Sequence, residues 1–333
     1  MKTGAAALLV IVSLFVGLRS EAVSFLTTLF SSPIPITIAV SSHFGSALTV
    51  VARQEGYYKA NGVDATVVLR TSGKVALAEV MQGRADFAVV AESPLVRSAL
   101  AGDKPAILAG IAFVDGHHTI IAPKSGGMRS ARDLPGKRVG IARGTSSEFF
   151  LERVLRYHAL PLNSVVRVSV DPEKMHQALK DGRVDAVCTW KPWEFTSKDT
   201  VRVPGDGIYT WHLFLVTRQE TADLKPELCR RVVAALVKAE AYSVRHRREL
   251  PRRLAPEYGM DVKSFEAYWA AVRLNVSLDH SMVRSLEEET RWVVGPANGA
   301  PQQMPNYLDL FFFEPLEKVR PSAVTIVHRG GKL

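Results

Sequence analysis

Cysteine is scarce in this chain of 333 residues, and several familiar sequence signatures are missing. Two cysteines exclude a disulfide-rich scaffold and a multi-cysteine zinc fold. The 23 glycines and 18 prolines follow no repeating pattern, which excludes collagen-like and low-complexity chains. The sequence has no phosphate-loop motif, no G-x-S-x-G elbow and no H-E-x-x-H helix. These absences remove several large enzyme classes and leave a globular chain without a known catalytic motif.

Long apolar runs are also rare, and the one at the N-terminus is informative. Lys2 precedes an apolar run over residues 5–18. This run is shorter than the roughly 20 residues that a membrane span needs, and it is typical of a secretory signal. Small residues at positions 20 and 22 predict cleavage near Ala22 and a periplasmic or otherwise exported protein. The alternative is an uncleaved anchor that continues through Phe25 and Phe30, as in a membrane-anchored sensor of ligands.

The overall composition is ordinary for a globular protein, with more basic than acidic residues. Hydrophobic residues make up 47% and charged residues 23%, and 42 basic against 33 acidic residues give a net charge of +9. The length fits two lobes of about 100–150 residues each. A run of arginines between 245 and 253 contains Glu249 and follows Glu240, which favours a solvated helix face. We therefore expect no nucleic-acid partner.

From Pro35 onward, short apolar strands alternate with amphipathic helices. Strands are predicted at 36–40, 65–69, 86–90, 106–113, 119–122, 137–142, 165–170, 185–189 and 213–216. Helices are predicted at 48–58, 75–81, from Ser93 as N-cap with Pro94 at the first helical position, and at 146–158, 172–180, 226–245, 264–274 and 281–292. This alternation predicts parallel α/β sheets.

Two similar sequences occur at equivalent points of the alternation. Gly83-Arg-Ala-Asp86 joins one predicted helix to its strand, and Gly182-Arg-Val-Asp185 does the same in the second half. We interpret this repeat as two lobes that are built alike.

Several stretches together resemble a known family. These are residues 52–59 (ARQEGYYK), 61–64 (NGVD), 81–87 (MQGRADF), 133–139 (DLPGKRV) with Gly144-Thr145, 181–186 (DGRVDA) and 191–193 (KPW). In their order and spacing over roughly residues 35–330, the chain resembles periplasmic solute-binding proteins of the sulfonate, taurine, nitrate and pyrimidine-precursor class. That class includes domains like the thiamine-precursor synthases, and its binding proteins feed ABC importers.

The resemblance implies a two-lobed periplasmic-binding-protein fold of type II, in which each lobe is a mostly parallel sheet flanked by helices. The first lobe is expected at 34–115 with the return of 205–330, the second at 118–200, with a hinge of two crossovers. A ligand is trapped between the lobes, and the closed form docks on a membrane permease. The implied protein is monomeric, performs no chemistry and needs no cofactor.

Ligands of open α/β sheets bind beyond the carboxyl ends of the strands, which selects the candidate site residues. They are Ser42, His43, Phe44, Thr71, Ser72, Glu92, Ser93, Arg143, Gly144, Thr145, Ser146, Trp190 and Trp193, together with His117.

Helix N-termini at these positions suit sulfonate, phosphate or carboxylate oxygens, and the segment from Arg143 to Ser146 is the best of them. Thr145 and Glu148 also have the spacing of a capping box, so local capping is the alternative. Ser93 has the same two interpretations.

Charge patterning adds a hypothesis about the ligand. Residues 34–115 hold seven basic and seven acidic residues, whereas 118–199 hold 14 and nine, a net charge of +5. Glu92, expected to face the cleft, would attract an amine, so we hypothesise a zwitterion such as taurine. The alternative for Glu92 is an ion pair with Arg97 or another base.

The remaining candidates have plainer interpretations. Trp190 and Trp193 either stack on a ligand or pack in the core or on the surface of a lobe. His43, His117 and His118 do not form a convincing metal set, because adjacent residues of a strand face opposite sides. An enzyme on the same fold is an alternative function, either a lyase with Glu92 as its acid or base or an enzyme similar to the pyrimidine-precursor synthases. Cys188 and Cys229 are expected on different lobes as buried free thiols.

Overall fold

The computed structural model describes residues 32–41, 44–70, 72–190, 193–195, 197–203, 207–295 and 304–327. The predicted signal (1–22), Ser42, His43, Thr71 and the side chain of Phe44 lie outside the described residues. Within the described part, no helix is both long and apolar enough to cross a membrane.

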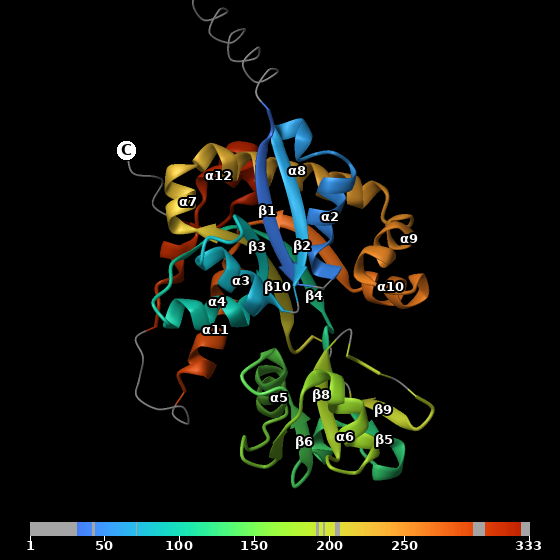
Figure 1. The fold of residues 1–333 in the computed structure, drawn as a ribbon. Coiled ribbons are helices and arrows are strands. Elements are labelled where there is room, and N and C mark those ends of the chain that lie inside the picture. Colours follow the sequence, from blue (N-terminus) through green and yellow to red (C-terminus); the bar gives the residue numbers. More distant parts are fainter. Residues whose placement is uncertain are drawn as a thin grey trace, which may run out of the picture.

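The strands form two separate sheets, one above the other in Figure 1. The first has the order β11-β4-β10-β3-β1-β2 and the second β7-β6-β8-β5-β9. The first sheet contains β1 (Ile34–Ser41), β2 (Val63–Arg70), β3 (Phe87–Ala91), β4 (Pro105–Asp115), β10 (Thr210–Arg218) and β11 (Val272–Ser277). The second contains β5 (His118–Pro123), β6 (Arg138–Ile141), β7 (Val166–Ser169), β8 (Ala186–Trp190) and β9 (Thr200–Val203). We call the unit around the first sheet the first lobe and the other the second lobe.

Helices cover both sheets. The first lobe carries α2 (Ala47–Gln54), α3 (Gly73–Met81), α4 (Glu92–Leu100), α7 (Gln219–Leu224), α8 (Pro226–Arg245), α9 (Leu250–Leu254), α10 (Val262–Trp269), α11 (His280–Val293) and α12 (Glu314–Val319). The second lobe carries α5 (Ser146–Tyr157) and α6 (Met175–Lys180). Because helices cover both faces of the first sheet, β3 and β4 are apolar and buried over nearly their whole length.

Both sheets are mixed, but most strands of each run in one direction, in agreement with the expected two-lobed fold of mostly parallel sheets. In the first sheet β1 pairs parallel with β2 and β3, but β10 is antiparallel to both β3 and β4. In the second, β6 is parallel to β7 and β8, but β5 is antiparallel to β8 and β9. The reason is the double crossover: β4 leaves the first lobe for β5, and β10 brings the chain back beside β4 in the opposite direction.

Three local predictions need correction. The helix predicted over 264–274 ends at Trp269, and the chain then forms β11, which pairs with β4. Strand β9 has no counterpart among the predicted strands. Helix α4 begins at Glu92 with Ala91 as its N-cap, so Ser93 lies in the first turn and does not cap the helix.

The repeated Gly-Arg-x-Asp sequence has the same structural role in both lobes. Gly83 and Gly182 have φ values of +73° and +66°, a conformation that glycine adopts readily. Asp86 accepts a hydrogen bond from the backbone N–H of Thr37 at 2.8 Å, and Asp185 accepts one from Arg138 N at 2.8 Å. Each aspartate therefore ties the strand that follows it to the neighbouring parallel strand.

Candidate ligand-binding site

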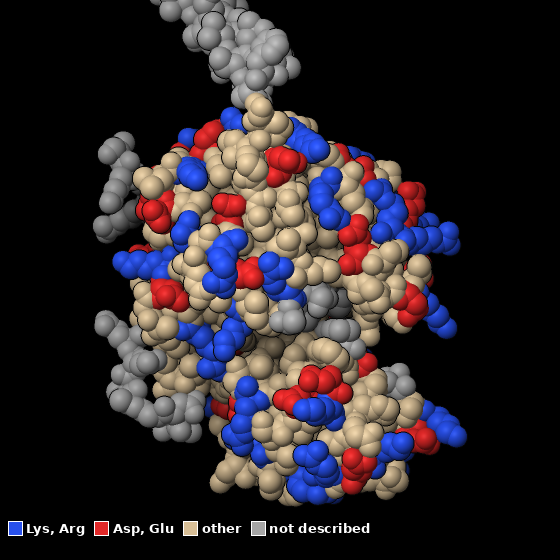
Figure 2. Space-filling view, in the orientation of Figure 1, with Lys and Arg blue, Asp and Glu red and all other residues tan. Residues whose placement is uncertain are grey.

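A cavity of about 610 Å³ lies between the lobes. Figure 2 shows the narrowing of the molecule between the lobes, with basic side chains above and below it. The first lobe contributes Ser41, Ser72, Gly73, Lys74, Leu77, Ala78, Met81, Gln82, Ala91, Ser93, Pro94, Arg97, Ser98, Asp103 and Trp211. His117, at the crossover, and Gly144, Thr145, Ser146 and Trp190 of the second lobe complete the lining.

Three helices begin at this cavity. Helices α3, α4 and α5 follow β2, β3 and β6, and each starts at the carboxyl end of its strand. Each presents one serine to the cavity from its first turn or cap: Ser72, Ser93 and Ser146. The N-terminal turns and the positive ends of three helix dipoles therefore converge on one space, an arrangement that favours a bound anion.

Arg97 adds a full positive charge and reaches from the first lobe to the second. A Cβ built on Gly144 would lie 3.4 Å from Arg97 Nη2, so the guanidinium group lies against the loop before α5. The same group lies over the ring of Trp292, 6.0 Å from its centroid. Lys74 is the other basic residue of the lining, and the acidic Asp103 accepts a hydrogen bond from Ser98 at 2.6 Å. The basic groups of the lining thus outnumber the acidic one.

The start of α5 is partly occupied by its own caps. Thr145 Oγ1 donates to Ala142 O at 2.6 Å and accepts from Ser147 N at 3.2 Å. Glu148 accepts from Gly144 N at 2.9 Å. The capping interpretation therefore holds for the Thr145 hydroxyl. Ser146 remains directed to the site, and its Oγ lies 2.8 Å from His118 Nε2.

Aromatic rings form one wall of the cavity. His117 and Trp211 are stacked, with ring centroids 4.0 Å apart and an interplanar angle of 1°. Trp190 lines the same cavity from the end of β8. Sequence reasoning missed Trp211, because the predicted strand began two residues later.

The rest of the cavity extends between α3 and α4. Leu77, Ala78 and Met81 line it from α3, and Pro94 lines it from α4. The lining residues of α3 run from position 73 to 81, which corresponds to about 12 Å along a helix. These apolar side chains adjoin polar ones, because Gln82, Ser98 and Asp103 line the cavity as well.

Two predicted residues lie away from the cavity on the second lobe. Arg143 is exposed, and its Nη2 donates to Arg167 O at 3.3 Å. Trp193 is 42% exposed and does not line the cavity. The predicted residues that the structure brings together are Ser72, Ser93, His117, Gly144, Thr145, Ser146 and Trp190.

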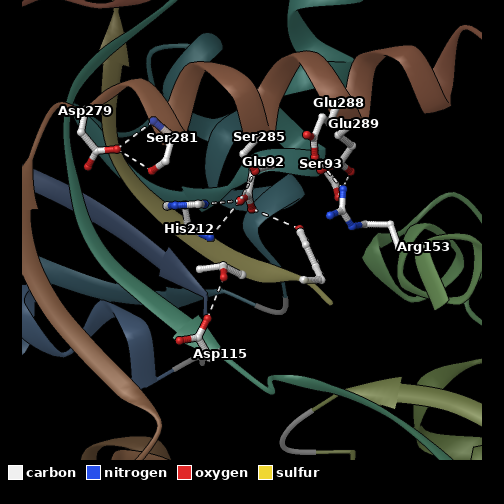
Figure 3. Close-up of polar contacts among 12 residues, drawn as sticks. Glu92, Ser93, Asp115, Arg153, His212, Asp279, Ser281, Ser285, Glu288 and Glu289 are labelled. Carbon is white, nitrogen blue, oxygen red and sulfur yellow. Dashed lines mark hydrogen bonds and ion pairs between the residues drawn. The ribbon is translucent and has the colours of Figure 1, made fainter. Parts of the chain in front are cut away.

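Glu92 does not face the cleft, contrary to the expectation from its position at a strand end. Its side chain is fully buried and points toward β10 and α11 (Figure 3). It accepts hydrogen bonds from His212 N and His212 Nδ1, both at 2.9 Å, from Ser285 Oγ at 2.9 Å and from Tyr209 Oη at 3.3 Å. The base beside Glu92 is therefore His212, and the carboxylate offers no partner to an amine in the cavity.

The charge of Glu92 determines the ionisation of that histidine. Burial by itself lowers the pKa of His212, but the hydrogen bond to Glu92 and its negative charge outweigh this effect, so the pKa is raised. Among the described residues, no group of three or more His, Cys, Asp or Glu side chains is arranged to hold a metal ion.

Sequence reasoning also missed Arg97, Lys74 and the apolar side of α3 as site residues. Arg97 follows Ser93 by four positions on the same helix, so helical periodicity was the available signal.

Comparison with known proteins shows the family to which this chain belongs. Residues 43–249 match the protein-family model described as NMT1/THI5 like. A protein from Brucella abortus (strain 2308), named as a binding protein, is 25% identical over 255 residues, which cover 73% of this chain and 75% of the relative.

Solved structures share the fold at low sequence identity. The alkanesulfonate-binding protein SsuA from Xanthomonas axonopodis pv. citri, bound to MOPS, has a TM-score of 0.71 and 18% identity, covering 85% of this chain and 99% of that one. The periplasmic aliphatic sulphonate binding protein SsuA from Escherichia coli has a TM-score of 0.70 and 18% identity, covering 84% and 96%. The desulfurization enzyme DSZB has a TM-score of 0.66 and 16% identity, covering 87% and 99%. Since the family match spans more than half of the chain, the protein belongs to the NMT1/THI5-like family and has the two-lobed α/β fold of the periplasmic binding proteins.

Proposed function

We propose that this protein captures a small organic anion of the sulfonate type between its lobes and delivers it, as the solute-binding component, to an ABC importer in the membrane. The observation that carries this proposal is the convergence of Arg97 and three helix N-termini on one interlobe cavity. Two of those N-termini belong to the first lobe and one to the second.

Charge explains why such an anion would close the protein. Arg97 and the N-terminus of α5 are both positive, and they face each other across the cleft. An anion between them replaces repulsion by two favourable interactions, so it binds the closed form better than the open one. The sulfonate group, with three acceptor oxygens, matches a site rich in serine hydroxyls and guanidinium donors.

The apolar side chains of the cavity select the rest of the ligand. Leu77, Met81 and Pro94 offer an apolar surface to an alkyl or aryl tail. Each CH₂ group buried there contributes about 0.8 kcal/mol, or roughly fourfold in affinity. Because Glu92 is outside the cavity, the ammonium group of taurine gains no carboxylate partner from it. We therefore favour an alkyl or aryl sulfonate over a zwitterion.

Export fits this role. We propose that residues 1–22 act as a cleaved secretion signal and that the mature protein works in the periplasm. The resemblance to proteins named as periplasmic sulfonate-binding proteins supports this placement.

Isothermal titration calorimetry with hexanesulfonate, taurine and the neutral 1-hexanol tests the proposal. We expect a dissociation constant of about 1 μM for hexanesulfonate, weaker binding of taurine and no detectable binding of the alcohol. Arg97→Gln should weaken hexanesulfonate binding at least tenfold (about 1.4 kcal/mol or more), whereas Arg252→Gln, at an exposed arginine of α9, should leave it unchanged. Equal binding of the alcohol and the sulfonate would show that the cavity does not recognise an anion.

An enzyme is the second candidate function, and one contact favours it. His118 Nε2 lies 2.8 Å from Ser146 Oγ at the cavity, the arrangement of a base beside a hydroxyl nucleophile. Glu92, the acid or base suggested by the sequence, is turned away from the cavity. Mass spectrometry of the ligand after prolonged incubation separates the two functions. A binding protein returns the ligand intact, whereas an enzyme yields product that disappears in Ser146→Ala.

A further inference from the structure

We propose that Glu289, a buried carboxyl group behind the cavity, controls the direction of the Ser93 hydrogen bond and thereby links anion capture to a proton. Glu289 does not line the cavity, so it is a positioning residue that acts through Ser93. The inference rests on the proposed function, because it describes how the same site binds its anion.

The geometry joins a buried acid to a hydroxyl of the site. Glu289 lies on α11 and is 0% exposed. Its Oε1 is hydrogen-bonded to the hydroxyl of Ser93, which lines the cavity from the first turn of α4 (Figure 3). Its Oε2 is buried and has no hydrogen-bond partner among the described residues. A carboxylate with one unsatisfied buried oxygen is costly, whereas the protonated acid is much less so.

The groups around Glu289 reinforce this preference. Glu92 and Arg97 face it from α4, Tyr209 from the segment before β10 and Tyr307 from the turn Tyr307–Leu310. Burial and the negative charge of Glu92 raise the pKa of Glu289 to about 8, against the opposing effects of Ser93 and Arg97. Near neutral pH the carboxyl group therefore holds its proton in most molecules.

The proton decides what Ser93 offers to a ligand. When Glu289 is ionised, Ser93 must donate to it, and only the lone pairs of the serine oxygen remain for the cavity. When Glu289 is protonated, the acid donates to Ser93, and the serine O–H is free to donate to an anion. By linkage, the anion binds the protonated form more tightly, and its affinity falls as pH rises through the pKa of Glu289.

Calorimetry with hexanesulfonate between pH 6 and 9.5, at constant ionic strength, tests the proposal. The ligand does not titrate in this range. We expect the wild-type protein to bind about tenfold more weakly at pH 9.5 than at pH 6, the effect of losing one hydrogen bond to a charged group. Glu289→Gln, whose amide can donate to Ser93 at every pH, should keep the tight binding throughout.

Two control variants separate this effect from other titrating groups. Glu287→Gln, on the same helix but paired with Arg291, should follow the wild-type pH profile. Ser93→Ala should bind at pH 6 as weakly as the wild type does at pH 9.5, with no further loss at high pH; it remains informative if Glu289→Gln fails to fold. A wild-type profile in Glu289→Gln, or an unchanged slope in Ser93→Ala, would overturn the proposal.

A ligand-free measurement keeps this inference separate from the proposed function. The infrared C=O band of a protonated carboxyl group, present at pH 6.5 in the wild type and missing in Glu289→Gln, reports the buried proton directly. Its absence from the wild type would overturn the inference. If the band is present but no sulfonate binds at any pH, the sulfonate proposal fails while the buried proton is established.

Discussion

The guanidinium group of Arg97 in the first lobe lies against Gly144 in the second, close enough that a Cβ at Gly144 would be 3.4 Å from Arg97 Nη2. Gly144 has a φ of +70°, which glycine adopts without strain. This pair brings a cation to the positive end of α5. An anion bound at this contact would therefore meet positive charge from both lobes.

Gly144→Ala tests this contact. The positive φ should cost about 1–2 kcal/mol of stability, and the new Cβ should displace Arg97 and weaken sulfonate binding several-fold. Gly136→Ala is the matched control, since Gly136 has a φ of +78° but no atom within 4 Å of its Cβ position. We expect thermal unfolding to show similar losses in both variants and calorimetry to show weakened binding only in Gly144→Ala. Equal affinities would argue against a role of the contact in binding.

A second set of contacts joins α11 of the first lobe to α5 of the second. Arg153 Nη1 lies 2.6 Å from Glu288 Oε2, and Trp292 Nε1 donates to Glu152 Oε2 at 2.9 Å (Figure 3 shows the first pair). The ring centroids of Trp292 and Phe149 lie 5.2 Å apart. These contacts form without a ligand, so they favour the arrangement of the lobes in this structure before any ligand binds.

Trp292→Ala should therefore increase the open population of the unliganded protein. Small-angle X-ray scattering should show a larger radius of gyration for this variant without ligand and the wild-type value with saturating hexanesulfonate. Arg291→Gln removes only a surface pair of the same helix and should behave as the wild type. Unchanged scattering of unliganded Trp292→Ala would mean that α11 does not contribute to closure.

Stability should be greatest in acidic solution, near pH 4.5. Hydrogen bonds from Arg230 and Arg231 outweigh the effect of burial and lower the pKa of Glu227 to about 2, so its stabilisation is lost as pH falls below the unfolded value of 4.5. Glu289 has a raised pKa of about 8, so the unfolded chain releases that proton first and stability falls as pH rises from 4.5 to 8. The pKa of His212 is raised above 6.5 in the folded protein. Its contribution to stability is therefore complete below pH 6.5 and is lost as pH rises through the pKa of the folded state.

Denaturant unfolding as a function of pH measures this profile. Glu289→Gln should flatten the decline between pH 5 and 8 and gain about 1–3 kcal/mol over the wild type at pH 8. A wild-type decline in this variant would assign the loss to other groups.

Both thiols should be unreactive in the native protein. Cys188 on β8 and Cys229 on α8 are free and buried, and burial raises the pKa of each thiol to about 12. They belong to different lobes, as the sequence predicted. Labelling with a thiol reagent should be negligible in buffer at pH 8 and should reach two equivalents in denaturant. Rapid labelling of the native protein would show that a lobe opens locally.

The order of strands and helices follows from local sequence, because each element is specified by its own apolar periodicity and by the turn residues that end it. Helix α8, predicted at 226–245, has those bounds in the structure. The sheet order and the antiparallel return of β10 depend instead on the double crossover. No local pattern encodes that crossover. Strand β11 was predicted as helix because its pairing with the distant β4 is likewise not visible in the local sequence.

The sequence by itself thus determined an α/β chain of two similar halves and the serines at its strand ends, since a helix that follows a parallel strand must begin at the carboxyl edge of the sheet. Only the tertiary structure decided which neighbouring side chains face the ligand. Glu92 and Ser93 are adjacent on one helix turn, yet Glu92 is held by His212, 120 residues later, while Ser93 lines the cavity. Adjacent helical residues point about 100° apart. The distant elements β10 and α11 pack against one face of α4, and this packing decides which face of the helix lines the cavity.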